Sequence, residues 1–131
     1  MKPFVKKIIK PWGYELIFTR DYSPVTSKVL HLNAGARFSY QYHEEKKECL
    51  VLLRGEAKII LDGQEFLMSK LKGYYIEPMT KHRCWGITAC DILESSTKET
   101  GKTVRLEDDY KRGDEIDKSR QLRDKAGVYL G

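Results

Sequence analysis

Residues 35–55 read GARFSYQYHEEKKECLVLLRG, and three side chains in this stretch stand at spacings suited to a metal site. Gln41 and His43 are two residues apart, so on an extended strand both side chains point to the same face. Glu48 opens the next strand-like run after a charged turn, and it can fold back beside His43. Imidazole nitrogen and carboxylate oxygen are suitable ligands for zinc and similar divalent ions. Together with His82, these residues predict a four-ligand metal site.

Gln41 would offer only a neutral amide oxygen, so Glu48 is the single anionic ligand and a bound divalent ion would keep a net positive charge. Such a site stabilises negative charge that develops on substrate oxygens. Zinc is the expected metal, with manganese, cobalt, nickel or iron as alternatives. The competing interpretation is that Gln41 and His43 form hydrogen bonds inside a barrel without any metal.

The same alternation predicts an aromatic face made of Phe38, Tyr40 and Tyr42, which we expect to pack between sheets or at a dimer surface. Arg37 would share the polar face with the ligands and could bind phosphate or sugar oxygens, because a guanidinium suits anionic oxygens. A salt bridge at the barrel rim is its alternative. Lys81, beside the fourth ligand, could bind phosphate or transfer protons, and its alternative is an exposed loop lysine.

Short strand-like runs separated by turn residues fill most of the 131-residue chain and predict an all-β fold, a double-sheet jelly roll. Asp62-Gly63 between two such runs is a strong hairpin signal. We expect one barrel domain over residues 1–113, followed by a charged tail or helix over residues 114–131. We expect an edge strand or arm at residues 1–11. Further strands are expected near residues 12–19, 27–32, 37–43, 48–53, 56–61, 64–68, 74–78, 83–85 and 90–96, and residues 104–110 should lie against the barrel.

Charges of both signs are interspersed along the chain, and the net charge is only +5, so no basic stripe of a nucleic-acid binder is present. A mildly basic protein can attract anionic small molecules such as sugar phosphates. Three scattered cysteines do not form a disulfide framework and suit a reducing compartment. The sequence shows neither a signal peptide nor an apolar run of about 20 residues, so we expect no membrane association and a cytoplasmic location.

The 35–55 stretch resembles the first cupin motif, with Gln41 in place of the usual first histidine, and the Gly73, Pro78 and His82 spacing resembles the second. Further segments resemble, in the same order, the cupin domain of type II mannose-6-phosphate isomerases. These are KPWGYE at 10–15, GARFS at 35–39, TKHR at 80–83 and RLEDDYKR at 105–112. The sequence departs from that family at Glu44, Glu45, Cys49 and Met79, where histidines and a glycine are usual. The nucleotidyltransferase domain that usually precedes this cupin is not expected here.

The resemblance implies a cupin barrel, or double-stranded β-helix, and an aldose-ketose isomerase that converts mannose 6-phosphate to fructose 6-phosphate. It implies a catalytic role for Arg112, and the metal set matches the Gln, His, Glu and His of type I isomerases. The proton-transfer base stays open among Glu45, Lys81 and a metal-bound water. The alternatives are a non-catalytic cupin that binds a sugar or sugar nucleotide and, third, a metal-dependent oxygenase. The dimers common among cupins suggest a homodimer with a phosphorylated sugar as ligand.

Overall fold

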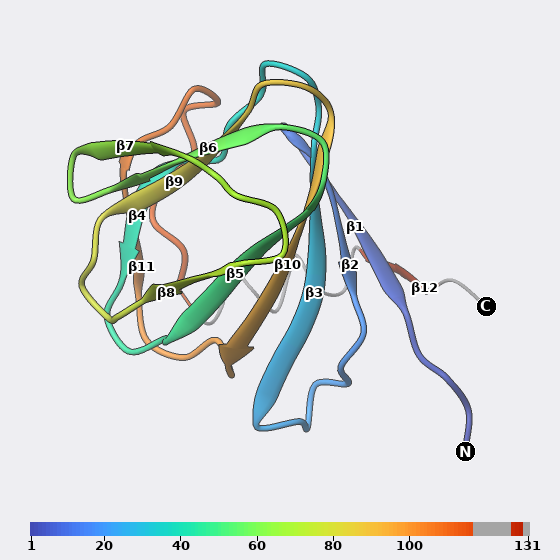
Figure 1. Cartoon of the computed structure of the whole chain (residues 1–131). Coiled ribbons are helices and arrows are strands. Elements are labelled where there is room, and N and C mark those ends of the chain that lie inside the picture. Colours follow the sequence, from blue (N-terminus) through green and yellow to red (C-terminus); the bar gives the residue numbers. More distant parts are fainter. Residues whose placement is uncertain (117–126, 130–131) are drawn as a thin grey trace.

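The computed structural model describes residues 1–116 and 127–129. Within these residues, twelve antiparallel strands form two sheets that face each other (Figure 1). The larger sheet has the order β12-β1-β2-β3-β10-β5-β8, and the smaller has the order β11-β4-β9-β6-β7. The strands are β1 Lys6–Lys10, β2 Gly13–Ile17, β3 Val25–Leu32, β4 Tyr40–His43, β5 Glu48–Arg54, β6 Ala57–Leu61, β7 Gln64–Leu67, β8 Gly73–Ile76, β9 His82–Gly86, β10 Cys90–Thr97, β11 Thr103–Glu107 and β12 Val128–Tyr129. The predicted all-β jelly roll is therefore confirmed.

Local sequence explains the pairing of strands. Leu61 pairs with Gln64 across the Asp62-Gly63 turn, and both turn residues have positive φ, of 44° and 83°. A two-residue turn of this kind matches the twist of a β-hairpin, and Asp-Gly tolerates it well. The hairpin signal in the sequence is confirmed.

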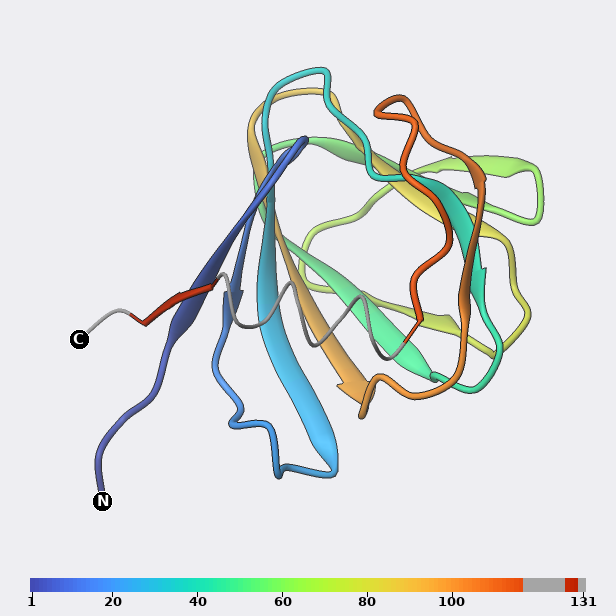
Figure 2. The ribbon, with the colours of Figure 1, turned by 180° about the vertical axis from the view of Figure 1, so that it is seen from behind.

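The hydrophobic core lies between the sheets at one end of the barrel. Along β3, β5 and β10, buried residues that face this core alternate with residues on the outer surface of the sheet, as expected for antiparallel strands with one face on the core. The cluster comprises Trp12, Leu30, Leu32, Phe38, Leu50, Leu52, Ala57, Ile59, Met68, Ile76, Cys84, Cys90 and Ile92. Seen from behind, the two sheets enclose the barrel interior, and the chain after β11 turns back along that strand (Figure 2). The core thus leaves the other end of the barrel available for polar side chains.

The C-terminal segment contributes to the barrel at two described points. Thr103 and Glu115 form an isolated antiparallel bridge, and β12 pairs with β1 through Lys6 and Lys7. The first strand was expected at the sheet edge, but β12 lies outside it. Most of the tail or helix predicted for residues 114–131 lies outside the described residues. Within residues 1–116 and 127–129, no helix has the length and apolar character needed to cross a membrane.

Candidate metal centre and its charged cavity

One cavity lies in the polar end of the barrel, between the two sheets. The space between its side chains is about 50 Å³, enough for a few water molecules. Its lining is dominated by ionisable and hydrogen-bonding side chains. The lining residues are Lys10, Trp12, Glu15, Lys28, Leu30, Phe38, Gln41, His43, Lys46, Glu48, Leu50, His82, Glu94, Glu99, Thr103, Arg105, Arg112 and Glu115.

Three of the four predicted ligands converge inside this cavity. His43 ends β4, Glu48 begins β5 and His82 begins β9, and all three side chains are buried. Their candidate ligand atoms all lie within 4.8 Å of one another. Gln41 pairs with His82 across β4 and β9, which places the fourth predicted ligand beside them. The fold therefore brings His43, Glu48 and His82 together as a candidate metal-binding triad, with Gln41 beside them.

His82 has a ring nitrogen whose surroundings suit a metal. Its Nδ1 lies 2.9 Å from the carbonyl oxygen of Thr80, which can only accept, so Nδ1 carries a proton and Nε2 is left facing the triad. Nε2 is buried outside hydrogen-bond geometry, although Glu48 Oε1 lies 2.8 Å away. A positive charge between these two atoms, from a proton or from a metal ion, stabilises so close an approach. This orphaned nitrogen fits a bound divalent ion.

His43 is held in the same way from the other strand. Its Nδ1 lies 2.8 Å from Thr103 Oγ1, and its Nε2 lies 3.6 Å from Glu48 Oε1. Burial and then the nearby Lys46 ammonium lower the pKa of His43 below its ordinary value. The imidazole is therefore neutral at pH 7, which is the form that binds metals. A hydroxyl on Nδ1 leaves Nε2 directed at the same point as His82 Nε2.

Gln41 is positioned by the buried hydroxyl of Ser39, which donates to Gln41 Oε1. The amide nitrogen then lies 3.5 Å from His43 Nε2. Rotating the amide by 180° exchanges its two ends, so that Ser39 accepts from the nitrogen and Oε1 faces the histidines. Ser39 supports either orientation because its hydroxyl both donates and accepts. Gln41 can thus present an oxygen to an ion bound by the triad.

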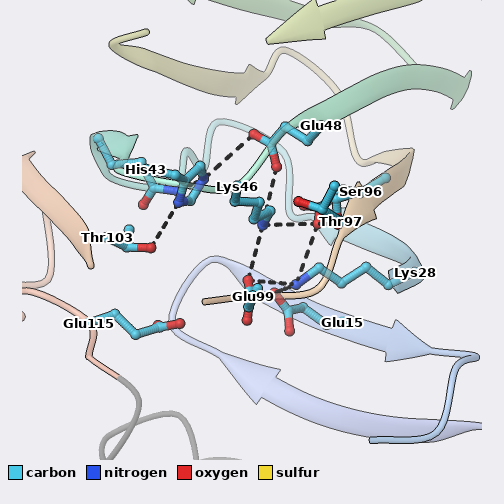
Figure 3. A network of polar contacts seen from close by, with 12 residues as sticks. Glu15, Lys28, His43, Lys46, Glu48, Ser96, Thr97, Glu99, Thr103 and Glu115 are labelled. Atoms are coloured by element: carbon cyan, nitrogen blue, oxygen red, sulfur yellow. Dashed lines mark hydrogen bonds and ion pairs between the residues drawn. The ribbon is translucent and has the colours of Figure 1, made fainter. Parts of the chain in front are cut away.

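Lys46 connects Glu48 to a deeper set of charges (Figure 3). Its buried ammonium lies 3.2 Å from Glu48 Oε2, 3.0 Å from Glu94 and 3.0 Å from Glu99. Burial alone would raise the pKa of Glu48, but the Lys46 ammonium and the two imidazoles hold it well below its usual range. Glu48 is therefore ionised, with Oε2 bound by Lys46 and Oε1 directed at the histidines.

Lys28 extends these contacts across the larger sheet. Its ammonium lies 3.3 Å from Glu15, 3.8 Å from Glu94 and 3.4 Å from Glu99. Burial would lower the pKa of Lys28, yet these carboxylates raise it above its ordinary value. We call the connected set the ion network, which consists of Glu15, Lys28, Lys46, Glu48, Glu94 and Glu99.

The charges of the ion network are balanced within the cavity. Two ammonium groups of the network face its four carboxylates. Lys10, Arg105, Arg112 and Glu115 line the same cavity, so five cationic and five anionic side chains meet there. Burial raises the pKa of Glu94, and Lys28 and Lys46 only partly offset that rise. Buried charges are stable only when they are compensated.

The other predicted site residues are divided between the cavity and the surface. Arg112 lines the cavity, whereas Lys81 is exposed, with its backbone NH donating to Asp62, and lies outside the lining. Arg37 forms a two-point ion pair with Asp109 at 2.7 and 2.8 Å, and its guanidinium stacks over Trp85. It is not among the cavity-lining residues. The substrate roles of Arg37 and Lys81 and the catalytic role of Arg112 stay predictions.

The prediction for the aromatic residues is confirmed in part. Phe38 packs between the sheets, as expected, and its ring contacts Trp12 and His82. It lines the cavity together with Gln41 and His43, however, and therefore does not share a face with Tyr40 and Tyr42. The physical reason is that β4 begins only at Tyr40, so strand alternation does not extend back to Phe38. His31 lies outside the cavity lining, 2.7 Å from Asp91, and its ring stacks on Tyr14.

Asp108 holds Arg112 at the cavity wall. Its carboxylate accepts from Arg112 N at 2.7 Å, Nε at 2.9 Å and Nη2 at 3.3 Å. Burial would raise the pKa of Asp108, but these hydrogen bonds lower it below its ordinary value. The carboxylate therefore stabilises the fold above the unfolded-state pKa of about 4, and this contribution is lost as the pH falls through the lower folded-state pKa.

We expect Asp108→Asn to lower the free energy of unfolding at pH 7 by about 1–3 kcal/mol, because charge-assisted hydrogen bonds are lost. The difference from the parent protein should shrink below about pH 4, where the parent carboxylate is also becoming protonated. Urea unfolding at pH 7 and pH 3 measures both values. A difference that is the same at the two pH values would contradict the charge-based explanation.

Most of the ion network was not expected from the sequence. Residues 44–47 were expected to form a charged turn, in which Lys46 proves to be buried. Strand parity offered a signal only for Lys28, which is two residues before the inward-facing Leu30 of β3. Met79 has φ of 69°, in the left-handed region where glycine is favoured, which accounts for the glycine usual there.

Comparison with known proteins agrees with this geometry. Residues 2–114 match the family described as "Mannose-6-phosphate isomerase C-terminal". Over 114 residues the chain is 30% identical to mannose-1-phosphate guanylyltransferase of Escherichia coli (strain K12), covering 82% of this chain and 23% of that protein. The chain spans about a quarter of the length of the curated relatives that it matches, 24% and 23%.

Solved structures show the same fold. KdgF from Halomonas sp. superposes with a TM-score of 0.65 at 14% identity, covering 72% of this chain and 86% of that one. A cupin protein from Bacteroides fragilis gives 0.53 at 22% identity, covering 58% and 67%. The resemblance drawn from the sequence motifs is confirmed. The chain belongs to the mannose-6-phosphate isomerase C-terminal family, whose domain is of the cupin type.

Proposed function

We propose that this protein is a divalent-metal-dependent aldose-ketose isomerase that converts mannose 6-phosphate to fructose 6-phosphate, with zinc as the metal. The observation that carries this proposal is that one cavity contains both a candidate metal site and two arginines that could bind a phosphate. His43, Glu48 and His82 form a candidate metal triad, and the guanidinium groups of Arg105 and Arg112 line the same space. Membership of the isomerase-like family supports this choice of chemistry.

The residues of the chain would bind and orient the sugar. Arg105 pairs with Gln41 across β11 and β4, so its side chain shares the inner face with the triad. A substrate anion held by the arginines would leave its C1 and C2 oxygens facing His43 and His82. A bound divalent ion would stabilise negative charge on those oxygens during proton transfer. The low dielectric of the buried site strengthens each of these contacts.

Proton transfer between C2 and C1 requires a base at the cavity wall. Among the alternatives left open by the sequence, Glu45 and Lys81 are exposed and outside the lining. Glu94 and Glu99 do line the cavity, and burial raises the pKa of Glu94. A carboxyl with a raised pKa holds a proton more firmly than an ordinary carboxyl, which suits a group that must both accept and return one. We therefore assign the proton transfer to a lining carboxylate, with Glu94 as the first candidate.

The direct test follows the C2 proton. The protein is loaded in turn with zinc, cobalt, manganese or nickel and incubated with mannose 6-phosphate in heavy water, and NMR measures fructose 6-phosphate and proton exchange. We expect product with at least one metal and its loss with chelator. Absence of product and exchange with every metal, while the protein holds that metal, would overturn the isomerase assignment.

The second candidate is a cupin that binds a sugar or sugar nucleotide without converting it. The turn after His43 favours it, because Glu44 and Glu45 stand where histidines are usual in the isomerases that the sequence resembles. Saturable binding of mannose 6-phosphate without product after prolonged incubation would favour this module over the isomerase. Homodimerisation and a cytoplasmic location stay predictions.

A further inference from the structure

We propose that Arg105 is the main anchor for the substrate's phosphate, and that the Glu115 carboxylate occupies this anion subsite until phosphate displaces it. The inference rests on the proposed function for the identity of the natural ligand, a sugar phosphate. The subsite itself is argued from the contacts of Arg105 and Glu115, and inorganic phosphate can test it alone.

Arg105 is built into the cavity wall rather than the solvated surface. Its side chain is 11% exposed, and Nε is buried without a hydrogen-bond partner. Nη1 donates to the carbonyl of Gly113 at 2.6 Å, and Nη2 lies 3.0 Å from Glu115 Oε2. A guanidinium offers five donors in one plane, a pattern that matches phosphate oxygens. The Glu115 oxygen thus stands where a phosphate oxygen would be bound.

Glu115 is carried by a short segment that pairs with the barrel through one isolated bridge, between Thr103 and Glu115. Two backbone hydrogen bonds of 2.9 Å link Glu115 to Thr103, whose hydroxyl also contacts the ring of His43. Figure 3 shows the Glu115 side chain projecting from this segment toward the ion network. A substrate anion at this place would therefore lie beside the triad, within the reach of one small sugar.

Electrostatics favour exchange of this carboxylate for phosphate. Burial and the nearby charge of Arg112 lower the pKa of Arg105, and Glu115 offsets only part of that effect. A phosphate monoester carries about −1.5 to −2 charges at pH 7 and three acceptor oxygens, against one charge for Glu115. Attachment to the chain gives Glu115 a high effective concentration, which keeps the subsite filled without ligand.

The size of the cavity also supports displacement of Glu115 by phosphate. The cavity of about 50 Å³ is bounded on one side by Glu115, which is 9% exposed. Moving this side chain outward would enlarge the cavity next to Arg105 without disturbing His43, Glu48 or His82. Displacement of Glu115 from Arg105 would thus couple phosphate binding to enlargement of the cavity.

The experiment measures the affinity of inorganic phosphate by isothermal titration calorimetry, with chelator present so that no metal contributes. Glu115→Gln should bind phosphate about tenfold more tightly than the parent protein, because it removes the competing charge. Arg105→Gln should lose measurable binding. Glu65→Gln, which removes a carboxylate from the exposed pair with Lys58, is the matched control and should not change the affinity. Unchanged or weaker binding by Glu115→Gln, or full binding by Arg105→Gln, would overturn the proposal.

A second measurement keeps the test valid if a variant fails to fold. In the parent protein, phosphate should shift the backbone NMR signals of Thr103, Arg105 and Glu115 and leave that of Lys58 unchanged. Saturating phosphate without these shifts would also overturn the proposal. Fructose 6-phosphate in the same titration distinguishes a sugar phosphate from free phosphate. Tight phosphate binding by Glu115→Gln combined with an inactive isomerase assay would preserve the subsite and reject only the proposed reaction.

Discussion

Replacing His82 with alanine should remove bound metal and isomerase activity together. His82 supplies one of two neutral nitrogen donors, and its Nε2 is directed at the triad by the hydrogen bond from Nδ1 to Thr80. Loss of even an outer partner of a metal ligand costs about 10–100-fold in metal affinity, so loss of the ligand itself should cost about 100-fold or more. Competition with a chromophoric chelator measures the affinity, and the heavy-water assay measures the activity.

The chain provides its own control for this variant. His31 is the remaining histidine, and it pairs with Asp91 on the larger sheet, away from the triad. His31→Ala should therefore bind zinc as tightly as the parent protein and keep its activity. If His82→Ala retained parental zinc affinity, the assignment of His43, Glu48 and His82 as the metal centre would be wrong.

Features that depend on short-range spacing could be predicted from the sequence. Gln41 and His43 are placed by strand parity alone, and the Asp62-Gly63 hairpin by turn chemistry alone. Each requires only a few neighbouring residues, so little else in the fold can override it. His82 needed the motif resemblance, because its approach to Glu48 depends on how β9 crosses β4.

The ion network could not be predicted in the same way. Lys28 and Glu94 come from β3 and β10, which are 66 residues apart in sequence and meet only through the registered pairing of Lys28 with Glu94. A buried lysine is unusual enough that an exposed face is the better expectation for any single lysine. Its burial becomes favourable only when several carboxylates converge, which is a property of the whole barrel. The contact of Arg105 with Glu115 could not be predicted either, because it also depends on the assembled barrel.

Replacing Lys46 with methionine should cause the largest loss of stability among the substitutions considered. Methionine keeps the length and apolar stem of lysine but leaves Glu48, Glu94 and Glu99 facing one another without their shared ammonium. Removing one partner of a buried ion pair typically costs about 3–5 kcal/mol. Urea unfolding of the metal-free protein at pH 7 measures this loss. Lys58→Met, in the exposed pair with Glu65, should cost no more than about 1 kcal/mol.

Metal and protons should each restore part of the stability of Lys46→Met, for one electrostatic reason. A divalent ion on Glu48 supplies positive charge where the ammonium was lost, so zinc should stabilise the variant more than the parent protein. Burial already raises the pKa of Glu94 in the parent protein. Ionisation of Glu94 therefore lowers the free energy of unfolding as the pH rises through this raised pKa. The variant should therefore recover stability as the pH falls through the raised pKa of Glu94 toward the unfolded-state value of about 4.3. Equal losses for Lys46→Met and Lys58→Met, at every pH and with or without zinc, would show that the ion network does not hold the site together.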